Sequence, residues 1–87
     1  MKWKTLFVDR VRRFSLDVDA ETGRTFVSIP VTNRLTDYLE WYEVDKETFE
    51  RYVADPTLAY EFVERAKRRE LDHLLLLKPG PDRGVAD

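Results

Sequence analysis

The side chains that could perform chemistry are few in this sequence of 87 residues. A single histidine, His73, follows Asp72, and an imidazole beside a carboxylate can act as a general base. A lone histidine at the start of a strand is more often a surface or packed side chain. The serines Ser15 and Ser28 lie in predicted strands, not in the strained turn that exposes a nucleophilic serine. We therefore predict no catalytic residue and no enzymatic activity.

Patterns that bind metals or cofactors are also missing from the sequence. There is no cysteine, which excludes disulfides, thiolate zinc sites and cysteine nucleophiles. The three glycines are scattered at positions 23, 80 and 84, so they form no glycine-rich phosphate loop. The carboxylates of residues 37–45 do not have the loop spacing of a calcium site. We expect neither a metal nor a cofactor.

The most distinctive stretch is residues 37–45, DYLEWYEVD, in which four carboxylates are mixed with large aromatic side chains. It lies in an acidic block, because residues 34–64 carry nine acidic and three basic side chains. Exposed tryptophan and tyrosine anchor interfaces, and carboxylates attract a basic partner over a long range. We predict a binding surface for a basic protein, made of Asp37, Tyr38, Glu40, Trp41, Tyr42, Glu43 and Asp45. In the alternative interpretation, the rings belong to the core and the carboxylates keep a small protein soluble.

Two clusters of basic side chains support a different function. They lie at residues 10–13 and 65–69, and folding could bring them together. The net charge of −2 argues against this function, since nucleic-acid-binding domains usually have a pI above about 9. Cations near a helix C-terminus also have a structural explanation in the helix dipole. The alternative function is a nucleic-acid- or ribosome-associated module that binds phosphates through Arg10, Arg12, Arg13, Arg65, Lys67, Arg68 and Arg69.

The elements that would position these side chains begin with a β-hairpin. Residues 13–18 alternate between polar and apolar, and residues 25–29 resume a β-rich pattern after a loop with Gly23 near its end. In a hairpin closed by this loop, Leu16 lies opposite Val27, and the apolar side chains meet on one face. Residues 3–8 predict a further strand.

Residues 37–44 fit both a helical stripe and a strand, although Tyr, Trp and Val favour strands. We favour a strand because Asp45 has the character of a helix N-cap, and a helix that begins there is most simply preceded by a strand. This helix spans residues 46–54 and ends before Pro56. Asp55 would cap a second helix that has Pro56 at its first position and an apolar stripe over residues 58–66.

The end of the sequence completes the predicted fold. Residues 73–78 predict a short strand that is apolar on both faces, and residues 79–84 are rich in proline and glycine, which indicates turns. The order is therefore strands, helix, helix, strand. It predicts one small α+β domain over residues 1–84, with an antiparallel sheet of four to five strands and two helices packed on one face. Residues 85–87 are expected to form a flexible C-terminal tail.

The sequence also suggests where the protein acts. The longest apolar run, residues 74–77, is far shorter than the roughly 20 residues that cross a bilayer, and no signal peptide is recognised. A domain of this size without disulfides fits a reducing compartment, so we expect a cytoplasmic protein with no membrane partner. The oligomeric state stays open, and an exposed edge strand offers a route to a dimer.

Three segments resemble a family of short bacterial proteins of poorly known role. They are residues 28–33, 37–44 and 77–84, which read SIPVTN, DYLEWYEV and LKPGPDRG. That class includes small immunity-type proteins encoded beside toxins. The resemblance spans roughly residues 24–84 and implies a cytoplasmic bacterial protein that neutralises a basic toxin through an acidic surface. It includes no catalytic motif and implies no individual site residues.

Overall fold

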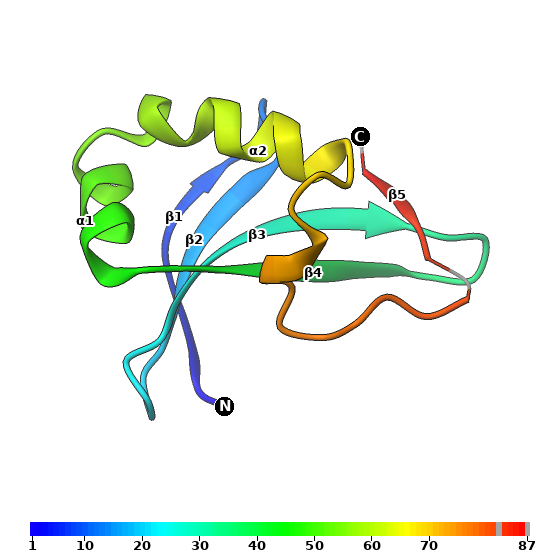
Figure 1. The fold of residues 1–87 in the computed structure, drawn as a ribbon, viewed down its shortest axis with the longest axis horizontal. Coiled ribbons are helices and arrows are strands. Elements are labelled where there is room, and N and C mark those ends of the chain that lie inside the picture. The colour runs from blue at the N-terminus through cyan, green and yellow to red at the C-terminus, as the bar shows by residue number, and fades with distance from the viewer. Residues whose placement is uncertain (82, 87) are drawn as a thin grey trace.

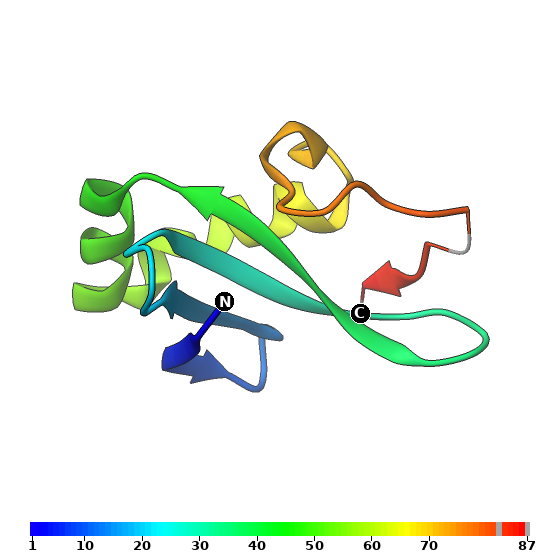
Figure 2. The ribbon, with the colours of Figure 1, turned by 90° about the horizontal axis from the view of Figure 1, so that it is seen from below.

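The protein consists of a sheet covered on one face by helices. The computed structural model describes residues 1–81 and 83–86. Four antiparallel strands are neighbours in chain order, namely β1 (Trp3–Asp9), β2 (Phe14–Asp19), β3 (Thr25–Thr32) and β4 (Asp37–Val44). Two helices, α1 (Lys46–Ala54) and α2 (Tyr60–Lys67), lie against one face of this sheet (Figure 1, Figure 2). A short strand, β5 (Val85–Ala86), pairs with β3 and follows the helices. The predicted α+β fold and its element order are confirmed.

The hairpin of β2 and β3 has the predicted register. Leu16 pairs with Val27, and the backbone N–H of Asp19 donates a hydrogen bond of 2.9 Å to the carbonyl of Arg24, which closes the loop. Gly23 has a φ of 78°, a left-handed conformation that glycine adopts without steric cost. Alternating polarity was therefore enough to predict which side chains of the hairpin face the helices.

The hydrophobic core lies between the sheet and the helices. Its buried side chains come from β2, β3, β4, both helices and the segment that follows α2. They are Phe14, Leu16, Val27, Ile29, Val31, Tyr42, Phe49, Ala59, Val63, Ala66 and Leu71. Removal of this apolar surface from water is the main force that holds the helix layer on the sheet.

Both helices begin at the predicted caps. Asp45 accepts a hydrogen bond of 2.7 Å from the backbone N–H of Thr48, and Asp55 accepts one of 3.2 Å from that of Thr57. The second helix starts with a 3₁₀ turn, η1 (Pro56–Ala59), in which the leading proline needs no donor, and continues into α2. No helix in the described part of the chain is long and apolar enough to cross a membrane.

Residues 37–44 form strand β4 and not the alternative helix. Tyr42 pairs with Val27 and belongs to the core, so it points toward the helices. Because side chains alternate along a strand, Tyr38 and Glu40 point the same way. The opposite face of β4 carries Asp37, Leu39, Trp41 and Glu43. This division of the acidic stretch into two faces determines what each of its residues does.

The prediction of a strand over residues 73–78 is wrong. The chain forms a short 3₁₀ helix, η2 (Asp72–Leu74), and Leu75 makes only an isolated antiparallel bridge to Tyr42. Leu74 and Leu75 pack against the core, whereas Leu77 is 70% exposed. A run of leucines requires burial, and a turn at the edge of the core satisfies this requirement as well as a strand does.

The expected flexible tail does not begin at residue 85. Strand β5 pairs with the end of β3, with Val85 opposite Thr32. Gly84 makes this close approach possible, because a Cβ atom there would lie 2.6 Å from the carbonyl carbon and oxygen of Thr32. The prediction of a tail is therefore wrong for residues 85 and 86, and residue 87 lies outside the described residues.

Candidate functional site

The four carboxylates of residues 37–45 do not gather on one surface. Glu40 points toward the helices and is only 7% exposed, while Asp37 and Glu43 lie on the opposite face of β4. Asp45 has left the strand and caps α1. The prediction of a single acidic surface on this stretch is therefore wrong, because the alternation of a strand separates neighbouring side chains.

Glu40 belongs to an ion cluster with Arg83 and Asp72, in which Glu40 and Arg83 are largely buried. Arg83 donates hydrogen bonds of 2.9 and 3.2 Å to Glu40 and of 2.7 and 2.9 Å to Asp72. These bonds lower the pKa of Asp72, and the two carboxylates, Asp72 first, raise the pKa of the Arg83 guanidinium. Tyr42 completes the cluster with a hydrogen bond of 3.0 Å from its hydroxyl to Glu40. The cluster ties the C-terminal segment to β4.

The carboxylates on the other face have partners of their own. Glu43 binds Arg24 through two hydrogen bonds, of 2.6 and 2.9 Å, which lower the pKa of Glu43. Asp37 accepts a hydrogen bond of 2.8 Å from the hydroxyl of Thr32. The backbone hydrogen bond from Thr48 lowers the pKa of the capping carboxylate, Asp45. Each carboxylate of the stretch thus has an intramolecular role.

The three aromatic side chains of β4 differ in exposure. Tyr42 is completely buried, and burial raises the pKa of its hydroxyl. Tyr38 is half-buried and accepts a hydrogen bond of 2.7 Å from the N–H of Gly84. Trp41, also half-buried, stacks on Trp3 with ring centroids 4.9 Å apart. The alternative interpretation, in which the rings belong to the core, holds for Tyr42, whereas Tyr38 and Trp41 keep part of their surface accessible.

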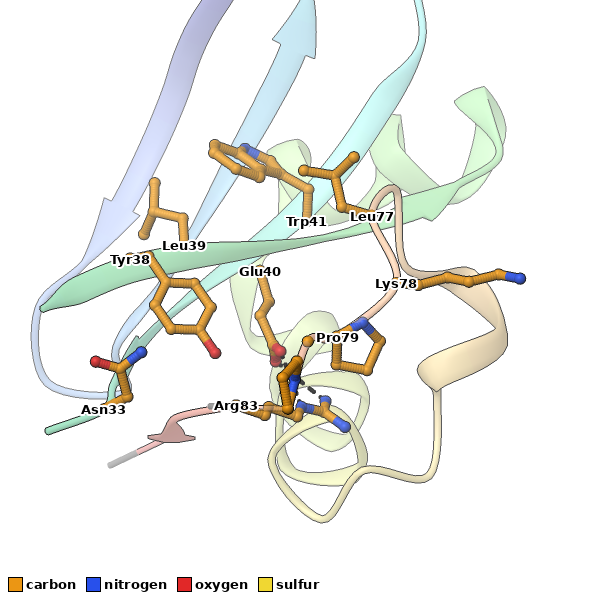
Figure 3. Close-up of a pocket in the computed structure, with 11 residues that line it drawn as sticks. Asn33, Tyr38, Leu39, Glu40, Trp41, Leu77, Lys78, Pro79 and Arg83 are labelled. Atoms are coloured by element: carbon orange, nitrogen blue, oxygen red, sulfur yellow. Dashed lines mark hydrogen bonds and ion pairs between the residues drawn. The ribbon is translucent and has the colours of Figure 1, made fainter. Parts of the chain in front are cut away.

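A cavity of about 320 Å³ lies along the outer edge of β4, within the size range of ligand pockets. Residues 38–41 form one side of it, and residues 77–81 with Arg83 form the other. Figure 3 shows Leu39 and Trp41 on one side of the strand, with Leu77 beside Trp41, and Glu40 on the other side with Arg83. The cavity is therefore built on the predicted stretch. Its lining consists mainly of aromatic and aliphatic side chains, together with Glu40 and Arg83, whose charges neutralise each other.

Part of the backbone edge of β4 faces this cavity without a partner. The carbonyl of Trp41 accepts a hydrogen bond of 2.9 Å from the N–H of Leu76, so its polar groups point away from β3. Orientation alternates along a strand, so the N–H and C=O of Leu39 also point outward. Within residues 1–81 and 83–86, nothing bonds to these two groups. An unpaired strand edge is a template for another chain.

The exposed negative charge is found on the helix layer. Residues 45–64 carry six carboxylates and two cationic side chains. Glu47, Glu50 and Glu61 are exposed, and none of the three forms an ion pair within the described residues. Exposed carboxylates of the acidic block that form no ion pair in the described part of the chain therefore lie on α1 and α2.

The two basic clusters do come together. Lys67 donates a hydrogen bond of 3.0 Å to the carbonyl of Arg12, and the Arg12 guanidinium lies 4.1 Å from the ring centre of Tyr60. Arg10 is exposed in the same turn. The other cations have intramolecular interactions. Arg65 and Arg68 bind Glu70, Arg69 donates to the carbonyl of Gly84, and Arg13 also interacts within the chain.

Apart from His73, the side chains considered for catalysis are held in intramolecular hydrogen bonds. Asp72 is held by Arg83, and His73 is exposed beside it. Ser15 and Ser28 are hydrogen-bonded to each other at 2.6 Å, and Ser28 donates to the buried carboxylate of Asp17. In the described part of the chain, no group of three or more His, Cys, Asp or Glu side chains is arranged to hold a metal ion.

Arg83 is the residue of this site that the sequence analysis missed. It lies 43 positions from Glu40, in a segment expected to consist of turns. A signal was present, because a strand that buries Tyr42 must point Glu40 toward the core, and a buried carboxylate requires a cation. Which of the arginines supplies that cation depends on the path of the chain after α2.

Comparisons with family models, with curated proteins and with solved structures found no match for this chain.

Proposed function

We propose that this chain is a protein-binding domain and that its contact surface is the cavity along β4. The observation that carries the proposal is the unpaired backbone edge at Leu39, which opens into a cavity of about 320 Å³. Unpaired edge groups are a liability that proteins usually cover, so an edge left open beside a preformed cavity favours a partner. The proposed contact surface thus combines the cavity with the strand edge beside it.

The lining of the cavity suits a polypeptide partner. Trp41 and Tyr38 have the amphipathic surface that anchors protein interfaces, and Leu77 adds exposed apolar area. The charges of Glu40 and Arg83 neutralise each other at the base, so neither is available as an acid or a base. We infer binding without catalysis.

The partner is proposed to be a basic protein. Support comes from the unpaired carboxylates Glu47, Glu50 and Glu61 on the helix layer, which would speed the encounter with a positive surface. The resemblance to immunity-type proteins would make this partner a toxin of the same bacterial cytoplasm. In this proposal, the helix layer attracts the partner and the β4 cavity holds it.

The experiment that tests the proposed surface is site-specific photo-crosslinking in cells that express the protein with its neighbouring genes. A photoreactive amino acid replaces Lys78 at the mouth of the cavity, and in a control it replaces Val8 on the exposed edge strand β1. We expect a crosslinked partner from position 78 and none from position 8. Crosslinking from position 8 alone would refute this choice of surface.

A matched pair of variants then measures affinity for the crosslinked partner. Leu77 and Val8 are both exposed, at 70% and 54%, so a charged side chain fits at either position without a loss of folding. Leu77→Asp should weaken binding at least about tenfold, because it places a charge in a desolvated contact. Val8→Asp should leave the affinity unchanged.

A second candidate function is binding of nucleic acid. The observation that favours it is the contact between the two basic clusters at Lys67 and Arg12. Electrophoretic shift of single- and double-stranded RNA and DNA at low salt tests it, with the variant Arg10→Glu as a control. No shift at the lowest salt concentration would eliminate this candidate.

A further inference from the structure

The protein itself shows how a second segment lies against the outer edge of β4. Leu75 forms an antiparallel bridge with Tyr42, and the N–H of Leu76 bonds to the carbonyl of Trp41. This pairing stops after Leu76. The chain then diverges through Pro79 and Pro81, which have no N–H to donate, and leaves the cavity between itself and β4.

We propose that the cavity takes an extended segment of the partner, which adds to β4 as a short extra strand opposite Leu39. This inference rests on the proposed function and specifies the form in which the partner binds. Leu39 offers one donor and one acceptor, both directed outward, and an extended chain supplies the complementary pair. A helix would not, because its backbone groups are bonded to one another.

The two faces of β4 determine which side chains the segment should carry. Residues in register on neighbouring strands point to the same face of a sheet. The residue opposite Leu39 therefore lies beside Trp41 and Leu77, and it should be apolar. The residues before and after it point toward Tyr38 and the Glu40–Arg83 pair, and they should be polar. The preferred segment reads polar, apolar, polar.

The first test measures amide hydrogen exchange in the free protein by NMR. The N–H of Leu39 should exchange rapidly, because it lies in an unpaired position of the strand. The N–H of Glu40 should be protected, since it points toward β3. Protection of Leu39 that increases with protein concentration would mean that a second copy of this chain occupies the edge, and it would refute a different protein as the occupant.

The second test uses eight-residue peptides selected from a random displayed library against the wild-type protein. Addition of a selected peptide should slow exchange of the Leu39 N–H at least about tenfold. Methylation of the backbone nitrogen of the central apolar residue of the peptide should weaken binding about tenfold, because it removes one hydrogen bond. Methylation of a flanking residue should have little effect, since its N–H points away from β4.

Two variants of the protein provide the matching control. Leu39→Pro removes the outward N–H, at a position where an edge strand tolerates proline, and it should weaken peptide binding at least about tenfold. Leu39→Ala keeps the N–H and should retain most of the affinity. The spectrum of Leu39→Pro must show the native sheet, and the N-methylated peptides repeat the test without any change to the protein.

The outcomes separate the inference from the proposed function. If peptides perturb Trp41 and Lys78 but the Leu39 N–H still exchanges rapidly, the cavity binds partners in another form, and strand addition is wrong. If selected peptides perturb only the helix layer or the turn at residues 10–13, the β4 surface itself is wrong. If peptides bind with protection of Leu39 and sensitivity to N-methylation, both proposals are supported.

Discussion

The two faces of β4 carry the same kinds of residues in different states. On the helix side, Glu40 is 7% exposed and its partner Arg83 is 10% exposed. On the opposite side, Glu43 and its partner Arg24 are 42% and 40% exposed. Both pairs are bidentate, and Arg83 binds Asp72 as well. We expect this difference in burial to decide how much the stability of the fold depends on each pair.

This comparison explains why an acidic stretch need not be an acidic surface. A buried carboxylate requires a cation, and here that requirement recruits the C-terminal segment and closes one wall of the cavity. An exposed ion pair is screened by water, so it does little to hold neighbouring segments in place. The sequence stretch therefore contributes to the proposed binding site mainly through the cavity that Glu40 and Arg83 help to build.

The largest effect on stability is expected from removal of Arg83, compared with removal of Arg24 on the opposite face. Arg83→Met leaves the buried Glu40 without a cation and should lower the free energy of unfolding by about 3 kcal/mol. Arg24→Met removes the exposed partner of Glu43, and its effect should be a small fraction of that. Urea unfolding followed by tryptophan fluorescence measures both variants.

If Arg83→Met and Arg24→Met lowered the free energy of unfolding by similar amounts, burial would not be what distinguishes the two ion pairs. Glu40→Gln with Arg83→Met provides a further control, because removal of both charges should restore part of the loss from Arg83→Met alone. No restoration would mean that Arg83 acts through its packing and not through its charge.

An intermediate effect is expected from the aromatic side chains on the face away from the helices. Trp3 is 37% exposed and covers Phe26 and Trp41, with ring centroids at 5.1 and 4.9 Å. Trp3→Ala should cost about 2 kcal/mol, less than for a fully buried tryptophan. Thermal unfolding measures this loss, and Trp3→Phe should recover part of it. An unchanged melting temperature for Trp3→Ala would show that this face has no core of its own.

The strands and helix caps could be predicted because their signals are local. The alternation around Leu16 and Val27 places one side chain opposite the other, and Asp45 and Asp55 cap helices within a few residues. These features depend on near neighbours in the chain, where period and spacing are informative. The same alternation assigns Glu40 to the core side as soon as β4 is known to be a strand.

The candidate site could not be predicted because its contacts are distant in sequence. The cavity depends on Arg83 reaching Glu40, and on residues 75 and 76 stopping short of a full strand. Composition predicts turns over residues 79–84 but not where the chain goes after them. Residues 85 and 86 pair with β3 only because Gly84 passes close to Thr32, a fit that no local pattern indicates.

The smallest effect concerns acid and the carboxylates that bind Arg24 and Arg83. The pKa values of Glu43 and Asp72 are lowered from 4.5 and 3.8 by their arginine partners. A carboxylate whose pKa is lower in the folded state stabilises the fold above its unfolded pKa, and this contribution is lost as the pH falls through the folded pKa. Unfolding by urea over a pH series should therefore show Glu43→Gln flattening the decline that begins near pH 4.5, and Asp72→Asn the decline that begins near pH 3.8. Identical pH profiles for both variants and the wild type would mean that neither arginine stabilises its carboxylate in solution.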